Sequence, residues 1–188
     1  MSYLRIAFSL TLLLLIFSLA VVACSDDDDD DDDNNDTNDD DDDDDVWTDP
    51  VTGLMWQNPG SAEGMIQSEA ETYCDDLVYA GFDDWRLPTI SELRSLITDC
   101  EVTATDGECE VIDDCLWDCF DLICNGCDYE QGPADGCYWN AELTGTCEWY
   151  WSSSLDENDS LWGVHFRNAA VGVDDSDDGV PPFVRCVR

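Results

Sequence analysis

The chain has 188 residues, of which 46 are Asp or Glu and six are Arg, with no Lys, so its formal net charge is −40. This charge excludes nucleic acid and anionic lipid head groups as electrostatic partners, because both are bound through Lys and Arg. The length predicts one domain. We place it at residues 46–188, which hold all eight Trp and ten of the eleven Cys.

Residues 1–23 are expected to form the signal peptide of a bacterial lipoprotein. An apolar stretch over residues 7–20 is followed by a small residue, Ala23, directly before Cys24. The lipoprotein pathway reads this pattern, attaches diacylglycerol to the Cys thiol and removes the leader. The alternative is an uncleaved membrane helix, although about 17 apolar residues are short for a bilayer. Both place the domain outside the cytoplasm, and Ser25 favours the outer membrane or the surface of a bacterial cell envelope.

Residues 24–45 are predicted to be a spacer between the lipid and the domain. Residues 26–45 include 16 Asp and no apolar side chain, so repulsion between like charges should keep them extended and disordered. Fully extended, they would reach at most roughly 70 Å. A second hypothesis is weak, unselective Ca²⁺ binding, since carboxylates suit Ca²⁺ but this stretch lacks a preorganised site.

The first elements expected in the domain are a strand and a helix. Residues 51–57 follow an Asp-Pro turn and have the composition of a strand. Ser61 is the expected N-cap of a helix that runs to about Ala80, and Gly81 supplies its C-terminal stop. The buried stripe of this helix should consist of residues at three- to four-residue spacing, namely Ile66, Ala70, Tyr73, Cys74 and Leu77.

A second helix is predicted to begin after Thr89. Thr89 and Glu92 have the spacing of a capping box, in which each side chain bonds the backbone N–H of the other residue. The helix should end near Asp99. Its apolar face is expected to hold Leu93, Leu96 and Ile97.

The remainder of the domain combines an insertion with short strands. Residues 100–147 contain eight Cys and few periodic runs, which predicts a long, irregular insertion stapled by disulfides. Strands are expected at residues 149–153, 161–166, 171–173 and 183–187. In the second of these, alternation places Trp162, Val164 and Phe166 on one face. Two helices and several short antiparallel strands predict an α+β domain.

The cysteines are expected to form disulfides. Assigning Cys24 to lipid leaves ten, an even number in an oxidising compartment. Cys74 and Cys186 lie apart from the others, and pairing them would join the two ends of the domain. A zinc site is the alternative for four of the rest, namely Cys115, Cys119, Cys124 and Cys127. The eight clustered cysteines allow 105 pairings, which the sequence leaves open: Cys100, Cys109, Cys115, Cys119, Cys124, Cys127, Cys137 and Cys147.

Six motifs along the domain carry a family resemblance. They are Thr52-Gly53-Leu54-Met55-Trp56-Gln57, Tyr73-Cys74, Asp84-Trp85-Arg86-Leu87-Pro88-Thr89 with Glu92-Leu93, Tyr150-Trp151-Ser152-Ser153-Ser154, Trp162-Gly163-Val164-His165-Phe166 and Val184-Arg185-Cys186-Val187-Arg188. In this order they resemble the C-terminal domain of the Legionella collagen-like protein (the Lcl C-terminal domain), over about residues 46–188. The resemblance implies a C-type-lectin-like fold, in which a Cys of the first helix pairs with a Cys of the last strand, here Cys74 with Cys186.

The resemblance also implies a class of function. The name-giving protein is a surface adhesin that binds glycosaminoglycan-like polymers, and it carries collagen-like repeats. Here an Asp tract replaces those repeats, and the negative charge opposes a sulfated polysaccharide. We therefore expect a non-enzymatic, lectin-like binding or adhesion module for an unidentified extracellular or envelope ligand. The alternatives are a purely structural surface protein, and an envelope enzyme or enzyme accessory on the scaffold of the formylglycine-generating enzymes, which share an Arg-Leu-Pro-Thr helix start.

Five residues are candidates for a site, and each has a structural interpretation beside the functional one. Arg86 could hold a ligand carboxylate, but an ion pair with a neighbouring acid is favoured. Tyr150, Trp151 and Trp162 could stack on a sugar, although their strand spacing favours the core. His165 is the single His of the chain and lies in an alternating strand, which favours a structural role over general base catalysis.

Calcium is the one cofactor that the sequence suggests, and only as a weakly bound ion. Asp174, Asp175, Asp177 and Asp178 resemble the start of a Ca²⁺ loop, but the twelfth position is Arg185, where an EF-hand needs Glu. A looser surface site could instead use these carboxylates or Asp156, Glu157 and Asp159. The sugar-binding motifs of C-type lectins, Glu-Pro-Asn or Gln-Pro-Asp with Trp-Asn-Asp, do not occur in the sequence.

Overall fold

The computed structural model describes residues 46–155, 159, 161–173 and 179–188. The chain divides into two units, residues 1–39 and 40–188, and all the described residues belong to the second. The predicted signal peptide, Cys24 and the Asp-rich spacer therefore lie outside the described residues. So do the Ca²⁺ candidates Asp156, Glu157, Asp174, Asp175, Asp177 and Asp178.

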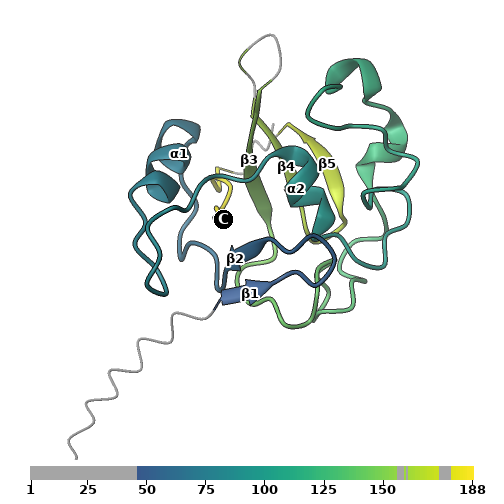
Figure 1. Cartoon of the computed structure of the whole chain (residues 1–188). Helices are drawn as coiled ribbons and strands as arrows, with labels where there is room; N and C mark the ends of the chain where they lie inside the picture. Colours follow the sequence, from purple (N-terminus) through teal and green to yellow (C-terminus); the bar gives the residue numbers. More distant parts are fainter. Residues whose placement is uncertain (1–45, 156–158, 160, 174–178) are drawn as a thin grey trace, which may run out of the picture. The chain divides into compact units, whose positions relative to one another are not determined.

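Within the described residues, the domain combines two short helices with two antiparallel sheets (Figure 1), which confirms the predicted α+β class. The helices are α1 (Gln67–Asp75) and α2 (Ile90–Ser95), and two 3₁₀ turns, η1 (Trp117–Cys119) and η2 (Leu122–Asn125), lie in the insertion. Strands β1 (Val46–Thr48) and β2 (Met55–Gln57) form a hairpin, and β3 (Trp149–Leu155), β4 (Leu161–His165) and β5 (Ala170–Val173) form the larger sheet. No described helix is long and apolar enough to cross a membrane.

The three-stranded sheet forms the base of the core. Its strand order is β3-β4-β5, with Tyr150 opposite Val164 and Val164 opposite Val171. Trp162, Val164 and Phe166 are fully buried, as their alternation predicted. Helix α2 packs against β3 and β4, so its apolar residues close the core over the sheet.

The first helix is shorter than predicted at its N-terminal end. Ser61 does not cap it, because the Ser61 Oγ atom instead accepts a hydrogen bond from Val184 N at 2.9 Å. Ser61 N also donates to Val184 O at 2.7 Å, so this segment runs extended beside residues far away in the sequence. The helix begins only at Gln67, and the predicted stripe residue Ile66 is 58% exposed.

The same helix also ends earlier than predicted. Ala80 and Gly81 both have positive φ angles, 50° and 77°. They form a tight turn in which Tyr79 and Phe82 exchange two backbone hydrogen bonds of 3.0 Å. Gly81 therefore serves a turn, for which its lack of a Cβ atom is suited, and α1 stops at Asp75.

Helix α2 starts with the predicted capping box. Thr89 Oγ1 accepts from Glu92 N at 3.3 Å, and Glu92 Oε2 accepts from Thr89 N at 2.9 Å. The helix ends at Ser95, four residues before the predicted end at Asp99. Asp99 has a φ of 58°, which no helical residue adopts.

The predicted strand at residues 51–57 is also shortened. The Asp49 carboxylate accepts hydrogen bonds from Val51 N at 2.9 Å and from Thr52 Oγ1 at 2.6 Å. Such side-chain bonds favour a turn over a strand. The turn takes up the first part of the predicted strand, and β2 consists of Met55–Gln57 alone.

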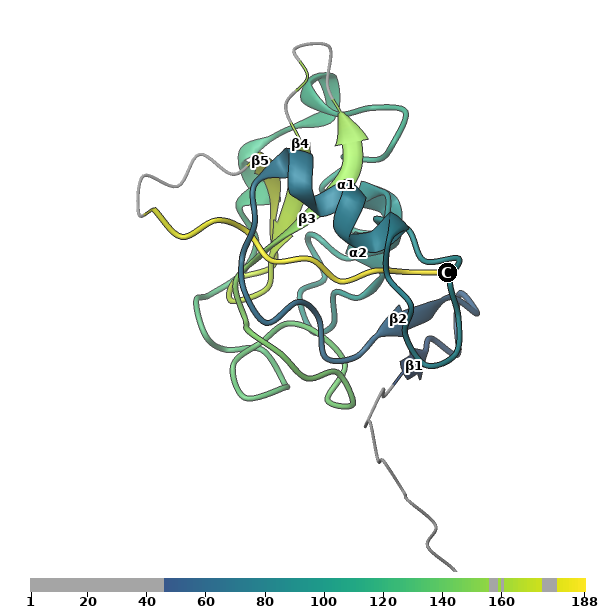
Figure 2. The same ribbon diagram turned by 90° about the vertical axis from the view of Figure 1, so that its left-hand side faces the viewer.

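The predicted closing strand at residues 183–187 is an extended segment that joins other elements by single bridges. Phe183 pairs with Tyr150 of β3, while Val187 pairs with Trp56 of β2 and with Arg86. Figure 2 shows the segment in yellow as it crosses the domain to the C-terminus. The Cys74–Cys186 disulfide ties it to α1, which is the pairing that the family resemblance implied.

The insertion between α2 and β3 is irregular, as predicted, and is held by four disulfides. The pairs are Cys100–Cys127, Cys109–Cys124, Cys115–Cys119 and Cys137–Cys147. They occupy all four cysteines of the zinc alternative, which is therefore wrong.

A buried arginine organises the first part of the insertion. The Arg94 guanidinium of α2 donates to the carbonyls of Thr103 at 3.0 Å, Ala104 at 2.8 Å and Cys109 at 2.7 Å, and also to that of Val111. No described carboxylate pairs with it. Burial lowers the pKa of Arg94, and the converging carbonyl dipoles stabilise the cation. The chain folds around this side chain where regular structure is absent.

Candidate functional site

The sequence candidate Arg86 forms a structural ion pair. Its guanidinium donates to both carboxylate oxygens of Glu92, from Nη1 at 2.7 Å and from Nη2 at 2.6 Å. The hydrogen bond to Glu92 raises the pKa of Arg86 above its ordinary value. Because this bidentate pairing occupies the planar fork, the geometry matches the structural interpretation of Arg86.

The three aromatic candidates lie at different depths in the domain. Tyr150 and Trp162 are fully buried, so neither presents a face to a sugar. Trp151 is half-buried, and its Nε1 atom donates to the Met65 carbonyl at 2.9 Å. These contacts place all three in the packing of the sheet and the segment before α1.

His165 is held on both ring nitrogens. Its Nδ1 atom lies 2.8 Å from Oδ1 of Asn168, and its Nε2 atom lies 3.3 Å from Oε2 of Glu148. The ring stacks on Tyr129, with centroids 5.9 Å apart, and packs against Trp149 at 5.2 Å. A base needs a nitrogen directed at its substrate, whereas these contacts orient His165 within the fold.

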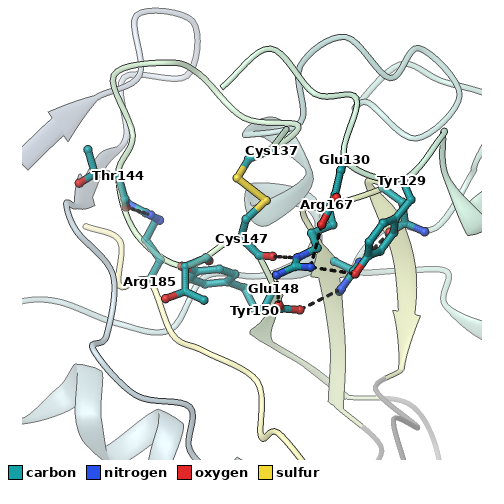
Figure 3. Close-up of a disulfide and its surroundings, with 12 residues drawn as sticks. Tyr129, Glu130, Cys137, Thr144, Cys147, Glu148, Tyr150, Arg167 and Arg185 are labelled. Carbon is teal, nitrogen blue, oxygen red and sulfur yellow. Dashed lines mark hydrogen bonds and ion pairs between the residues drawn. A yellow bond between two sulfur atoms is a disulfide. The ribbon is translucent and has the colours of Figure 1, made fainter. Parts of the chain in front are cut away.

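Arg167 links this group to the Cys137–Cys147 disulfide (Figure 3). Its Nε atom donates to the Cys147 carbonyl at 2.9 Å, and its two Nη atoms contact Glu130 at 2.9 Å and Glu148 at 2.7 Å. A hydrogen bond with Tyr129 raises the pKa of Arg167. Every nitrogen of this guanidinium has a partner within the domain, so the contacts of Arg167 are structural.

Arg185 is the second buried arginine, and it also appears in Figure 3. Nη1 donates to the Gln57 carbonyl at 2.8 Å and to Asn58 Oδ1 at 3.2 Å, and Nη2 donates to the Thr144 carbonyl at 2.6 Å. Its Cζ atom lies 5.0 Å from the centroid of the Trp139 ring. Burial lowers the pKa of Arg185, and neutral oxygens and an aromatic face stabilise its charge.

Together these contacts occupy every arginine of the described residues. Arg94 and Arg185 are buried, Arg86 and Arg167 pair with glutamates, and Arg188 pairs with Asp84 at 2.6 Å.

A different surface, which no motif of the sequence indicated, contains a pocket. It has a volume of about 310 Å³ and lies between the loop that leads into η1 and the end of β3. We call it the Trp117 pocket. Its lining combines three carboxylates with apolar side chains: Asp113, Asp114, Cys115, Leu116, Trp117, Asp118 and Leu155.

Trp117 is held at this surface by covalent and aromatic contacts. It is the middle residue of the short loop closed by the Cys115–Cys119 disulfide. Its ring packs edge-to-face on Trp162, with centroids 5.1 Å apart, and on Phe120 at 5.6 Å. Even so, 45% of Trp117 is exposed. The fold thus holds a large aromatic surface in place and leaves nearly half of it in contact with solvent.

Asp113 is fixed by hydrogen bonds to two other elements. Its Oδ1 atom accepts from Ser91 N of α2 at 3.3 Å and from Ser154 Oγ of β3 at 2.8 Å. Burial alone would raise the pKa of Asp113, but these hydrogen bonds outweigh it and hold the pKa below its ordinary value. Asp114 and Asp118 are exposed, and neither has a hydrogen bond or ion pair with another described residue.

The carboxylates of the pocket do not form a metal site. Among the described residues, no group of three or more His, Cys, Asp or Glu side chains could hold a metal ion. The sequence signal that could have identified the pocket is the run Asp113-Asp114-Cys115-Leu116-Trp117-Asp118-Cys119, in which acids flank a Trp inside a short Cys-bounded loop.

Comparison with known proteins identifies a family for the domain. The family model described as the Lcl C-terminal domain matches residues 45–188. No curated protein and no solved structure matches the chain significantly.

Proposed function

We propose, since the chain belongs to the Lcl C-terminal domain family, that it is a lipoprotein of the bacterial cell envelope whose domain is a non-enzymatic, lectin-like binding or adhesion module. The lipid would be attached at Cys24, and the Asp-rich residues would space the domain from the membrane. The motif order over residues 46–188 and the Cys74–Cys186 disulfide support the C-type-lectin-like part of this proposal.

The Trp117 pocket is the observation that supports binding. Exposed aromatic side chains are enriched where proteins recognise ligands. Trp117 is not a flexible surface residue, because the Cys115–Cys119 disulfide and two aromatic neighbours hold it. A preorganised contact loses less freedom on binding, which favours a recognition role for this surface.

The contacts of the polar residues give less support to the enzyme alternative. That alternative requires polar groups that converge on His165 or Arg86 in an open cleft. Both side chains are already engaged, His165 with Asn168 and Glu148, and Arg86 with Glu92. Their arrangement favours a rigid scaffold over an acid–base pair.

A binding screen tests the proposed module. We would purify the mature chain with Cys24→Ser and screen it against neutral and charged glycans, peptides and bacterial or host cells. Binding that is lost in Trp117→Ala is the expected result. Leu122→Ala is the matched control, since Leu122 is an exposed apolar residue of the same insertion outside the pocket lining. Absence of any binding that depends on Trp117 would contradict the proposal.

The anchor is tested separately by expression in a bacterial host. The natural chain should incorporate labelled fatty acid and sediment with the membranes, because several acyl chains on one Cys anchor stably. The Cys24→Ser chain should incorporate no label. A natural chain that carries no label would refute the lipoprotein part of the proposal and leave the binding part standing.

A further inference from the structure

We propose that the Trp117 pocket receives the cationic side chain of a basic peptide segment, with an Arg or Lys seated between the indole and the carboxylates. This inference rests on the proposed binding function and names the class of its ligand. It is carried by the charge, the apolar lining and the size of the pocket.

The charge of the pocket is uniformly negative. Asp113 is held in place by Ser91 and Ser154, while Asp114 and Asp118 are exposed and unpaired among the described residues. No arginine lines the pocket. Three carboxylates without a counterion disfavour an anion and attract a cation, and the net charge of −40 adds to this field.

The apolar lining fits the remainder of a basic side chain. Indole is the aromatic ring that attracts a cation most strongly, and a guanidinium also stacks on it. Leu116 and Leu155 supply apolar surface for the methylene stem, which long basic side chains bury while the charged head stays near polar groups. A metal ion would use none of this apolar surface.

The size of the pocket favours a single side chain over a larger ligand. Its volume of about 310 Å³ lies at the lower limit of ordinary ligand clefts. Further apolar surface extends beyond it, since Ile112 is 43% exposed and its backbone pairs with Cys115. A peptide can place one cationic side chain in the pocket and lay its neighbours on this surface.

The test measures binding of three short, amidated peptides of one sequence that carry Arg, citrulline or Glu at the central position. The mature Cys24→Ser chain is titrated by fluorescence anisotropy at physiological salt. We expect the Arg peptide to bind best, because citrulline keeps the shape of Arg without its charge.

Two double variants test whether peptide binding depends on the carboxylates of the pocket or on the general negative charge of the chain. Asp114→Asn/Asp118→Asn removes two charges at the pocket, and Asp75→Asn/Asp76→Asn removes two exposed charges near the end of α1. Both retain the Asp-rich tract. We expect the first double variant to bind the Arg peptide about tenfold more weakly, and the second to bind it less than twofold more weakly. Trp117→Ala should also weaken it, and circular dichroism would report whether this variant stays folded.

The outcomes distinguish this inference from the proposed function. Equal weakening by the two double variants, or equal binding of the citrulline peptide, would overturn the basic-peptide assignment. A neutral glycan whose binding depends on Trp117, with no peptide binding, would overturn it too while supporting the module. If no ligand depends on Trp117, both the inference and the proposed function fail.

Discussion

The guanidinium of Arg185 lies over the Trp139 ring, with its Cζ atom 5.0 Å from the ring centroid, and no described carboxylate pairs with it. In a chain with 46 acidic residues, this buried cation is stabilised by neutral groups alone. Carbonyl oxygens and aromatic faces require no second desolvated ion, so the large cost of burying a carboxylate is avoided. Arg94 follows the same rule with four carbonyls.

We expect Arg185→Met to lower the free energy of unfolding by about 3 kcal/mol or more. The substitution leaves the buried Gln57 carbonyl without a donor, at about 1–3 kcal/mol. It also removes the hydrogen bonds to Asn58 Oδ1 and to the part-buried Thr144 carbonyl. Urea denaturation with the disulfides intact would measure it. Arg188→Met is the matched control, because its pair with Asp84 is at the surface, where solvent screens the charges, and its loss should lower the stability much less. Equal effects of the two variants would contradict this account of Arg185.

We expect Arg94→Met to loosen the insertion locally. Its guanidinium binds carbonyls between Thr103 and Val111, and regular structure is absent there. Hydrogen exchange should therefore accelerate at residues 100–112, with protection in β4 retained. Arg86→Met breaks the ion pair with Glu92, which lies on the same helix as Arg94. This variant should leave hydrogen exchange in the insertion unchanged. Uniform acceleration across the whole domain would show that Arg94 acts globally instead.

Removal of individual disulfides should follow the length of chain that each one closes. On the chain-entropy relation, Cys74→Ala/Cys186→Ala, with a separation of 112 residues, should cost about 4–5 kcal/mol. Cys115→Ala/Cys119→Ala, with a separation of 4, should cost about 2 kcal/mol. The denaturant midpoints of the two double variants measure these costs, and we expect the lower midpoint for the variant without Cys74–Cys186. A larger cost for the short loop would mean that native contacts, rather than loop closure, dominate.

The pH dependence of stability should include a contribution from Glu92. Burial raises the pKa of Glu92, but hydrogen bonds from Arg86 and Thr89 outweigh it and bring the pKa below the ordinary value of 4.5. Because the pKa of Glu92 is lower in the folded protein than in the unfolded chain, its ionised form stabilises the fold above pH 4.5. This stability is lost as the pH falls through the folded pKa. Glu92→Gln keeps an oxygen for Thr89 N, removes the charge, and replaces one of the two oxygens that accept from Arg86 with an NH2 group.

We therefore expect Glu92→Gln to melt about 3 °C below the natural chain at pH 7, and the two melting temperatures to converge in acid. Thermal melts at pH 7, 5, 4 and 3 would follow the convergence. A difference that stays constant over this range would show that the lost hydrogen-bond geometry matters, and that the charge does not.

Local signals allowed parts of the fold to be predicted from the sequence. The capping box at Thr89 and Glu92 involves residues three apart, and the burial of Trp162, Val164 and Phe166 follows from strand alternation. The start of α1 could not be predicted in this way, because Ser61 is bonded to Val184, a residue 123 positions away.

The candidate site was less accessible to sequence reasoning than the fold. The exposure of Trp117 depends on the Cys115–Cys119 disulfide, and the sequence left open which of seven other cysteines pairs with Cys115. The local sequence likewise does not separate the buried Arg94 and Arg185 from the surface Arg188, since each follows an apolar residue directly. Their partners are backbone carbonyls or distant side chains, and these carry no local sequence signature.

The path of residues 183–188 constrains how the domain can be made. This segment lies between β2 and β3, bridged to Trp56 and Tyr150 and bonded to α1 through Cys186. A ribosome synthesises these residues after every other described element, so the core cannot close before they have been made. The nascent chain must keep its Trp-rich strands from associating until then, and its dense acidic charge would hinder premature association during that interval.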